Sequence, residues 1–149
     1  MKVKKFLLGI VLLAAAAFIA FCVKETMDLS HPEYAVARLN VTADTQEIPV
    51  TIAAYDWSFF FKSKNVTAAR DVVDITLPSV ELLGGERLEL DFSLQPESVE
   101  IKRSESYSYS FLDAAGDLTV PYSSGAYIYQ VDAVFNRGTA RYYFYIIVQ

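Results

Sequence analysis

Cysteine and histidine are nearly missing from this chain of 149 residues, which has one of each. Because Cys22 has no second cysteine to pair with, no disulfide can form within the chain, and the fold must depend on its own core. His31 is the only imidazole, so a Ser-His-Asp or Cys-His catalytic arrangement is not expected. One histidine and one cysteine also cannot complete a zinc site. We therefore expect no enzyme activity and no cofactor.

Positive charge is scarce after the first residues. Three of the 13 lysines and arginines precede Val23, whereas all 18 acidic residues follow it, which leaves 10 basic and 18 acidic residues and a net charge of −8 beyond Val23. Such an acidic surface argues against a nucleic-acid partner. The pair Asp113 and Asp117 lacks the dense spacing of a calcium loop, so we expect a turn there and no metal site.

The N-terminus contains what the rest of the chain lacks, a long apolar run. Lys2, Lys4 and Lys5 precede 18 uncharged residues, 6–23, and Lys24 ends the run. A helix of this length spans about 27 Å, close to the roughly 30 Å hydrocarbon core of a bilayer. The lysines before the run predict a cytoplasmic N-terminus and a C-terminal domain outside the cell. We expect a membrane anchor or signal segment at residues 1–24, a stalk or linker at 25–40 and a single domain at 41–149.

Two alternatives to an uncleaved anchor remain open. Residues 15–17 are three alanines, at which a signal peptidase could cut. Residues 19–22, Ile-Ala-Phe-Cys, resemble the lipobox of bacterial lipoproteins, in which the cysteine is lipidated and becomes the new N-terminus. Phe21 stands where such motifs have Gly, Ala or Ser. Lipidation of Cys22 would tether the domain as the helix does.

The external part is predicted to consist of short strands. In residues 87–93 and 98–103, apolar and polar side chains alternate, which is typical of half-buried strands. Asn136, Arg137 and Gly138 predict the turn of a hairpin that joins the last two strands. The loop from Trp57 to Arg70 is expected to be irregular. The predicted strands are 35–41, 48–55, 71–77, 87–93, 98–103, 107–112, 118–120, 126–135 and 140–148. Strands about every ten residues, with no long helical pattern between them, indicate an all-β antiparallel sandwich.

Two resemblances refine this fold class. Gly125, Tyr127 and Tyr129 resemble the sixth strand of immunoglobulin-like domains; the resemblance implies that Tyr127 is a tyrosine corner, whose hydroxyl binds the backbone a few residues upstream. More widely, the chain resembles a group of uncharacterised, membrane-anchored or lipoprotein-type domains of Gram-positive bacterial surface proteins. The motifs that carry this second resemblance are Tyr-x-Trp at residues 55–57, Gly-x-Tyr-x-Tyr at 125–129 and Gly-x-Ala-x-Tyr-x-Phe at 138–144. It implies an immunoglobulin-like fold and a surface location, but no activity.

Two sets of large apolar residues, most of them aromatic, are candidates for a partner site. The last strand is apolar on both of its faces, and its outward residues, Tyr143, Tyr145 and Ile147, could form an exposed patch of about 400 Å². The other interpretation is that the stalk or the loop after Trp57 covers this face. The second set is Trp57, Phe59 and Phe61, which could form a platform for carbohydrate or peptide, although a lone Trp in such a fold is more often part of the core.

The sequence therefore predicts a membrane-tethered extracellular domain that acts as a binding or scaffolding module. Its expected partners are the membrane, through the N-terminal helix, and a protein or a component of the cell wall. The alternative is a surface module that binds or hydrolyses carbohydrate with the loop from Trp57 to Arg70 and nearby carboxylates.

Overall fold

The computed structural model describes residues 2–59, 65–72, 75–105, 108, 110–114 and 118–149. Two helices precede the strands, α1 (Lys2–Ser30) and α2 (Pro32–Ala35). In the described residues the strands are β1 (Leu39–Ala43), β2 (Gln46–Ile48), β3 (Val50–Ser58), β4 (Asn65–Ala69), β5 (Ser79–Leu82), β6 (Leu88–Phe92), β7 (Ser98–Glu105), β8 (Leu112–Asp113), β9 (Gly125–Phe135) and β10 (Gly138–Val148). The expected combination of one N-terminal apolar helix with mostly antiparallel sheets is confirmed.

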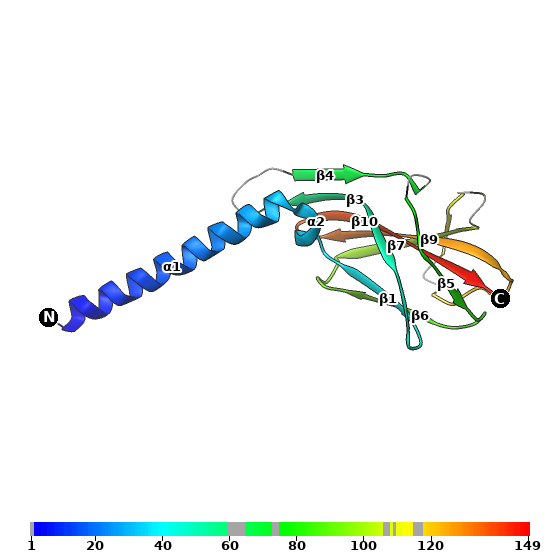
Figure 1. Cartoon of the computed structure of the whole chain (residues 1–149), viewed down its shortest axis with the longest axis horizontal. Coiled ribbons are helices and arrows are strands. Elements are labelled where there is room, and N and C mark those ends of the chain that lie inside the picture. Colours follow the sequence, from blue (N-terminus) through cyan, green and yellow to red (C-terminus); the bar gives the residue numbers. More distant parts are fainter. Residues whose placement is uncertain (1, 60–64, 73–74, 106–107, 109, 115–117) are drawn as a thin grey trace.

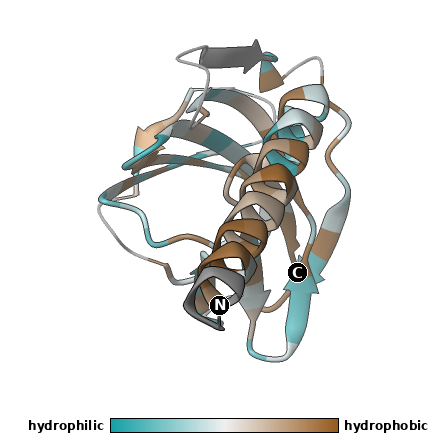
Figure 2. Ribbon diagram, turned by 90° about the vertical axis from the view of Figure 1, so that its left-hand side faces the viewer, coloured by the Kyte–Doolittle hydropathy of each residue, from teal (hydrophilic) through white to brown (hydrophobic). Residues whose placement is uncertain are grey.

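Helix α1 extends away from the strands as a single rod (Figure 1). Its 29 residues span about 43 Å, and the stretch Phe6–Ser30 is long and apolar enough to cross a membrane. Seen from the helix end, α1 is largely hydrophobic along its exposed length (Figure 2). Residues 25–40, expected as a stalk, contain the end of α1, all of α2 and the start of β1. The end of α1 contacts the domain, because Leu29 packs against the core and Glu25 is only 7% exposed.

The strands form two sheets. The three-stranded sheet has the order β2-β1-β6, and the seven-stranded sheet has the order β4-β3-β10-β9-β7-β8. Strand β5 also belongs to the larger sheet, since it pairs in parallel with Tyr145–Val148 of β10, beyond the point where β3 ends its pairing at Phe144. In the described residues, the other strand pairs are antiparallel. Strand β10 is therefore paired on both edges along its whole length.

The main core lies between the two sheets. The three-stranded sheet contributes Leu39, Val41 and Leu88, and β9 and β10 contribute a longer set of alternate residues. The rings of Tyr129 and Phe144 stack there, with centroids 4.7 Å apart. The inward residues of β10 are Ala140, Tyr142, Phe144, Ile146 and Val148.

Five predicted strands are wrong in whole or in part. The run 48–55 is divided, because Pro49 has no N–H to continue the ladder and the chain passes there from one sheet to the other. Residues 71–77 are not a strand in their described part; a hydrogen bond from the Ile75 N–H to the Val72 carbonyl forms a turn instead. The first strand begins at Leu39 rather than at residue 35, since α2 occupies Pro32–Ala35.

The serine-rich run 107–112 is also mostly not a strand. Residues 107 and 109 lie outside the described part, Ser108 lies in a turn, and β8 begins only at Leu112. The Ser108 hydroxyl donates to the Glu105 carbonyl and accepts from the Ser110 N–H. Such local bonds between side chain and backbone compete with a sheet ladder. Residues 118–120 make a single bridge, between Thr119 and Arg87.

Candidate functional site: the inter-sheet groove

The two sheets separate next to α2. Strands β1 and β2 pair from Ala43↔Gln46 to Val41↔Ile48, and Pro49 then leads the chain into β3, which pairs with β10. Strand β1 stays with β6 in the smaller sheet. As a result, β1 and β3 belong to different sheets. A groove of about 450 Å³ lies between them, a size common for ligand sites.

We call this feature the inter-sheet groove. It has an apolar floor and a polar rim. The floor residues are Ala37, Leu39, Ile48, Pro49, Val50, Ile52 and Tyr142. The rim residues are Glu33, Arg38, Asn40 and Glu47. All four of these rim residues are exposed, whereas Leu39, Ile48 and Tyr142 are buried.

Tyr142 fixes the base of the groove. Its hydroxyl donates a hydrogen bond of 2.6 Å to the Ala37 carbonyl, which joins β10 to the segment between α2 and β1. Burial raises the pKa of this hydroxyl well above its ordinary value, because the phenolate would be desolvated. Tyr142 therefore stays neutral, and its hydrogen bond closes the end of the groove that lies next to α2.

Both walls of the groove include strand positions that are paired on one side only. Pairing between β1 and β2 ends at Val41, so Leu39 and Asn40 are paired only with β6 in the described residues. Pairing between β3 and β4 begins at Ala54, so Val50, Thr51 and Ile52 are paired only with β10 in that same part of the chain. The groove thus lies beside an open edge of each sheet.

The rim has more negative than positive charge. Glu33 and Glu47 face one cation, Arg38, so the net formal charge of the rim is −1. The negative charge of Glu33 also acts on Tyr55 of β3. Burial raises the pKa of the Tyr55 hydroxyl, the Glu33 carboxylate raises this pKa further, and the positive charge of Arg70 lowers it. The rim is therefore suited to cationic groups.

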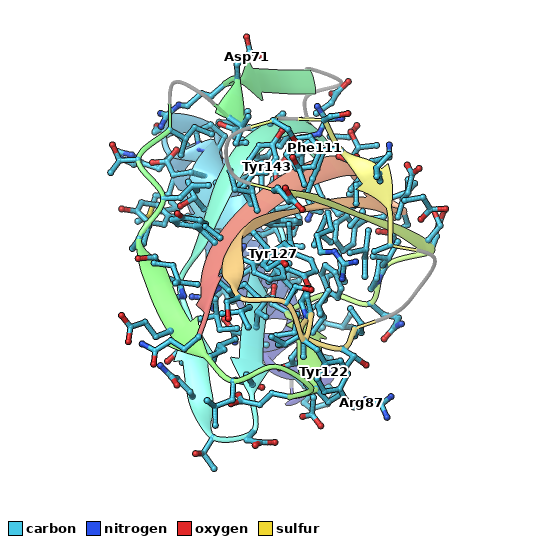
Figure 3. All side chains as sticks on the ribbon, turned by 90° about the vertical axis from the view of Figure 1, so that its right-hand side faces the viewer. Asp71, Arg87, Phe111, Tyr122, Tyr127 and Tyr143 are labelled. Atoms are coloured by element: carbon cyan, nitrogen blue, oxygen red, sulfur yellow. The ribbon has the colours of Figure 1, made fainter. Side chains whose placement is uncertain are left out.

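The proposed patch of Tyr143, Tyr145 and Ile147 is not an open surface. Tyr143 is 4% exposed and packs with Ala53 and Ile128 in a second apolar cluster. Three residues that follow β4, namely Val72, Ile75 and Leu77, pack against this cluster, and we call them the outer strap. Phe111 adds a ring contact with Tyr143 at 5.8 Å, and both residues are labelled in Figure 3. Tyr145 and Ile147 are half-buried. In the described residues, the outer strap and Phe111 cover this face.

The outer face of β10 also has a polar network. The Tyr143 hydroxyl donates to Gln130 Oε1 at 3.0 Å, and Gln130 Nε2 donates to Asp132 Oδ2 at 2.6 Å. Arg141 completes the chain with two bonds to the Asp132 carboxylate, the shorter of 2.6 Å from Nε. These side chains satisfy one another, so we do not assign a ligand to them.

The aromatic platform is not formed either. Trp57 is 1% exposed and packs edge-on against Phe135, with ring centroids 5.5 Å apart. Phe59 is also part of the main core, and Phe61 lies outside the described residues. The segment from Trp57 to Arg70, expected to be irregular, includes β4, which pairs with β3. Trp57 and Phe59 are therefore part of the main core.

Two further candidates are placed as follows. The Tyr127 hydroxyl donates a 3.0 Å hydrogen bond to the Ser123 carbonyl, four residues upstream. Tyr127 and the exposed Tyr122 lie at the end of the molecule opposite α1 (Figure 3). Cys22 is a free cysteine within α1.

The groove residues were not predicted from the sequence, although Pro49 directly after an apolar strand residue was a usable signal of a chain leaving its sheet. In the described part of the chain, no group of three or more His, Cys, Asp or Glu side chains is placed to hold a metal ion.

Comparison with known proteins gives no relative: no family model, no curated protein and no solved structure matches this chain.

Proposed function

We propose that this chain is a single-pass membrane protein that holds an external domain at the membrane surface as a binding or scaffolding module. One observation carries the proposal: α1 continues from its apolar stretch to Ser30 without a break, and Leu29 packs against the core of the domain. A domain packed on its anchor has a limited range of orientations above the bilayer. Confinement to the membrane raises its effective concentration toward a partner at the same surface.

The domain would belong to the immunoglobulin-like class of surface domains in Gram-positive bacteria. Two mostly antiparallel sheets around the main core and the bond from Tyr127 to Ser123 support this assignment. The lysines before the apolar run favour a cytoplasmic N-terminus, and processing at Cys22 would replace the helix with a lipid.

A role without catalysis fits the site better than the hydrolytic alternative. That alternative needs an aromatic platform beside carboxylates, and both described members of the platform, Trp57 and Phe59, are buried in the core. The inter-sheet groove offers a binding surface instead, since it has an apolar floor and a charged rim.

Labelling with a membrane-impermeant maleimide tests the topology. In a Cys22→Ala background, a cysteine at Tyr122, which is 82% exposed at the far end of the domain, should react in intact cells. A cysteine at Lys4 should react only after the membrane is opened. The reverse pattern, or equal reaction at both positions, would disprove an external domain. The mass of the purified wild-type protein separates an intact anchor from a lipidated chain that begins at Cys22.

A further inference from the structure

We propose that the inter-sheet groove binds an extended, basic segment of a partner protein, which adds as a strand between the open edges of β1 and β3. This inference rests on the proposed binding function and names its site and its class of partner. The segment would place alternate side chains on the apolar floor and the others at the acidic rim.

The open edges specify an extended backbone. Leu39 and Asn40 on one wall, and Val50 to Ile52 on the other, have strand partners on one side only in the described residues. Exposed strand edges pair readily with another strand, and proteins usually block or cover them. Here residues of both edges, Leu39 and Asn40 on one side and Val50 and Ile52 on the other, line the same groove.

The floor specifies apolar side chains at every second position. Pro49 is exposed and Val50 and Ile52 are half-buried, so these three residues present the accessible apolar surface, whereas Ile48 and Tyr142, 1% and 2% exposed, belong to the core behind it. An extended segment points successive side chains in opposite directions. Residues such as Val, Ile or Phe at alternate positions would therefore fill the floor while their neighbours point to the rim.

Charge decides between possible occupants. The rim has two carboxylates and one guanidinium, and the chain beyond Val23 has a net charge of −8. A second copy of this chain would bring the same negative charge, which disfavours it. A lipid acyl chain would fill the floor but leave the strand edges and the rim unused. A segment with Lys or Arg at the rim positions uses all three features.

The test begins with a random-peptide selection. The full chain is held in nanodiscs of zwitterionic lipid, and displayed heptapeptides are selected against it after depletion on empty nanodiscs. We expect enriched peptides with alternating β-branched or aromatic residues, Lys or Arg between them and no central Pro. Enrichment of acidic peptides, or no enrichment above the empty discs, would overturn the inference.

A pair of matched variants then locates the binding. Glu47 and Glu89 both lie opposite Thr42, on either side of β1, and both are exposed, but only Glu47 lines the groove. For the best peptide, Glu47→Lys should raise the Kd about three- to tenfold, and Glu89→Lys less than about twofold. Equal effects would mean that only the general charge of the domain matters, which contradicts the groove assignment.

Backbone methylation tests the pairing itself. N-methyl groups at alternate residues of the peptide remove donors and prevent pairing with an edge, so the Kd should rise about tenfold or more in one of the two registers. Unchanged affinity in both registers would show that the peptide does not bind as a strand. The groove inference fails in that case. It also fails if Asn40→Trp in the groove weakens binding no more than Thr42→Trp beside it. Either result leaves a binding module with another site. Failure of the proposed function appears separately, in the maleimide topology test.

Discussion

The two faces of β10 are both apolar but are covered in different ways. The inner face packs against a second sheet, with Phe144 fully buried and stacked on Tyr129. The outer face packs against the outer strap, a segment with little regular structure, and against Phe111. A strand that is apolar on both faces therefore indicates two covers rather than an exposed binding surface. The inner cover belongs to the cooperative core, whereas we expect the outer cover to open locally.

The largest effect is expected at the inner face. Phe144→Ala should lower the free energy of unfolding by about 3–5 kcal/mol, because it removes a buried ring and leaves a cavity against Tyr129. Denaturant titration of the protein in micelles, followed by Trp57 fluorescence, measures this. If the variant does not fold, Phe144→Leu provides a milder test, with an expected loss of about 1–2 kcal/mol. A loss below about 1 kcal/mol for Phe144→Ala would contradict the comparison.

A smaller and more local effect is expected at the outer cover. Leu77→Ala should cost about 1–2 kcal/mol, since this side chain is only half-buried. Amide exchange should increase in the outer strap and in Phe111 while the inner residues of β9 stay protected. Equal acceleration throughout the domain would mean that the two covers are one cooperative unit.

The loss of stability at alkaline pH should distinguish the two faces of β10, because each face has one buried tyrosine, Tyr142 inside and Tyr143 outside. Burial raises the pKa of Tyr142 strongly and that of Tyr143 in the same direction, so the folded state favours the neutral phenol. The resulting stability is complete below about pH 10, the ordinary pKa, and is lost as the pH rises through the folded values. Each tyrosine that ionises only on unfolding contributes a fall of about 1.4 kcal/mol per pH unit. We expect Tyr142→Phe to reduce this slope between pH 10 and 12 more than Tyr143→Phe does; the opposite order would contradict the deeper burial of the inner face.

The polar contact of the outer face is expected to contribute less. Tyr143→Phe removes the hydrogen bond to Gln130 and should cost about 1 kcal/mol. Tyr145→Phe, on the same face and half-buried, is the matched control, with an expected change below about 0.5 kcal/mol. Equal losses from thermal or chemical unfolding would exclude a specific role of the Gln130 bond.

The smallest effect is expected from the ion pair at the end of this network. Arg141 and Asp132 are partly exposed, with side chains 44% and 24% accessible. A double-mutant cycle with Arg141→Met and Asp132→Asn should give a coupling of about 0.3–1 kcal/mol that weakens in high salt. A coupling independent of salt would indicate that the pair is more buried than its exposure implies.

The parts of the fold that depend on local pattern could be predicted from the sequence. The alternating run 98–103 and the turn at Asn136 to Gly138 give β7 and the hairpin of β9 and β10. The change of sheet at Pro49 and the β-bulge in β3 were not predicted. There Arg141 pairs with Ala54 and Tyr142 with Ile52, so Ala53 is an extra residue, and the apolar alternation of β3 is broken. A single sequence does not reveal such a shift of register.

The candidate site was harder to predict than the fold for a related reason. The groove exists because β1, before Pro49, pairs with β6, and β3, after Pro49, pairs with β10. Such pairing depends on residues far away in the chain. Its walls include Leu39 and Val50, which look like ordinary strand residues in the sequence. The two proposed partner sites were inferred from their aromatic composition. Large aromatic residues contribute most to cores, however, and most of the described members of these sites are buried.

The direction of β10 has a mechanical consequence. The strand runs along the long axis of the molecule, away from the anchor, and the chain ends at the opposite tip from α1 (Figure 1). A pull at that tip, directed away from α1, would act along β10 and load its ladders with β9, β3 and β5 in shear. Hydrogen bonds loaded in shear must break together rather than one after another. The strand arrangement therefore resists tension applied between α1 and the far tip of the domain.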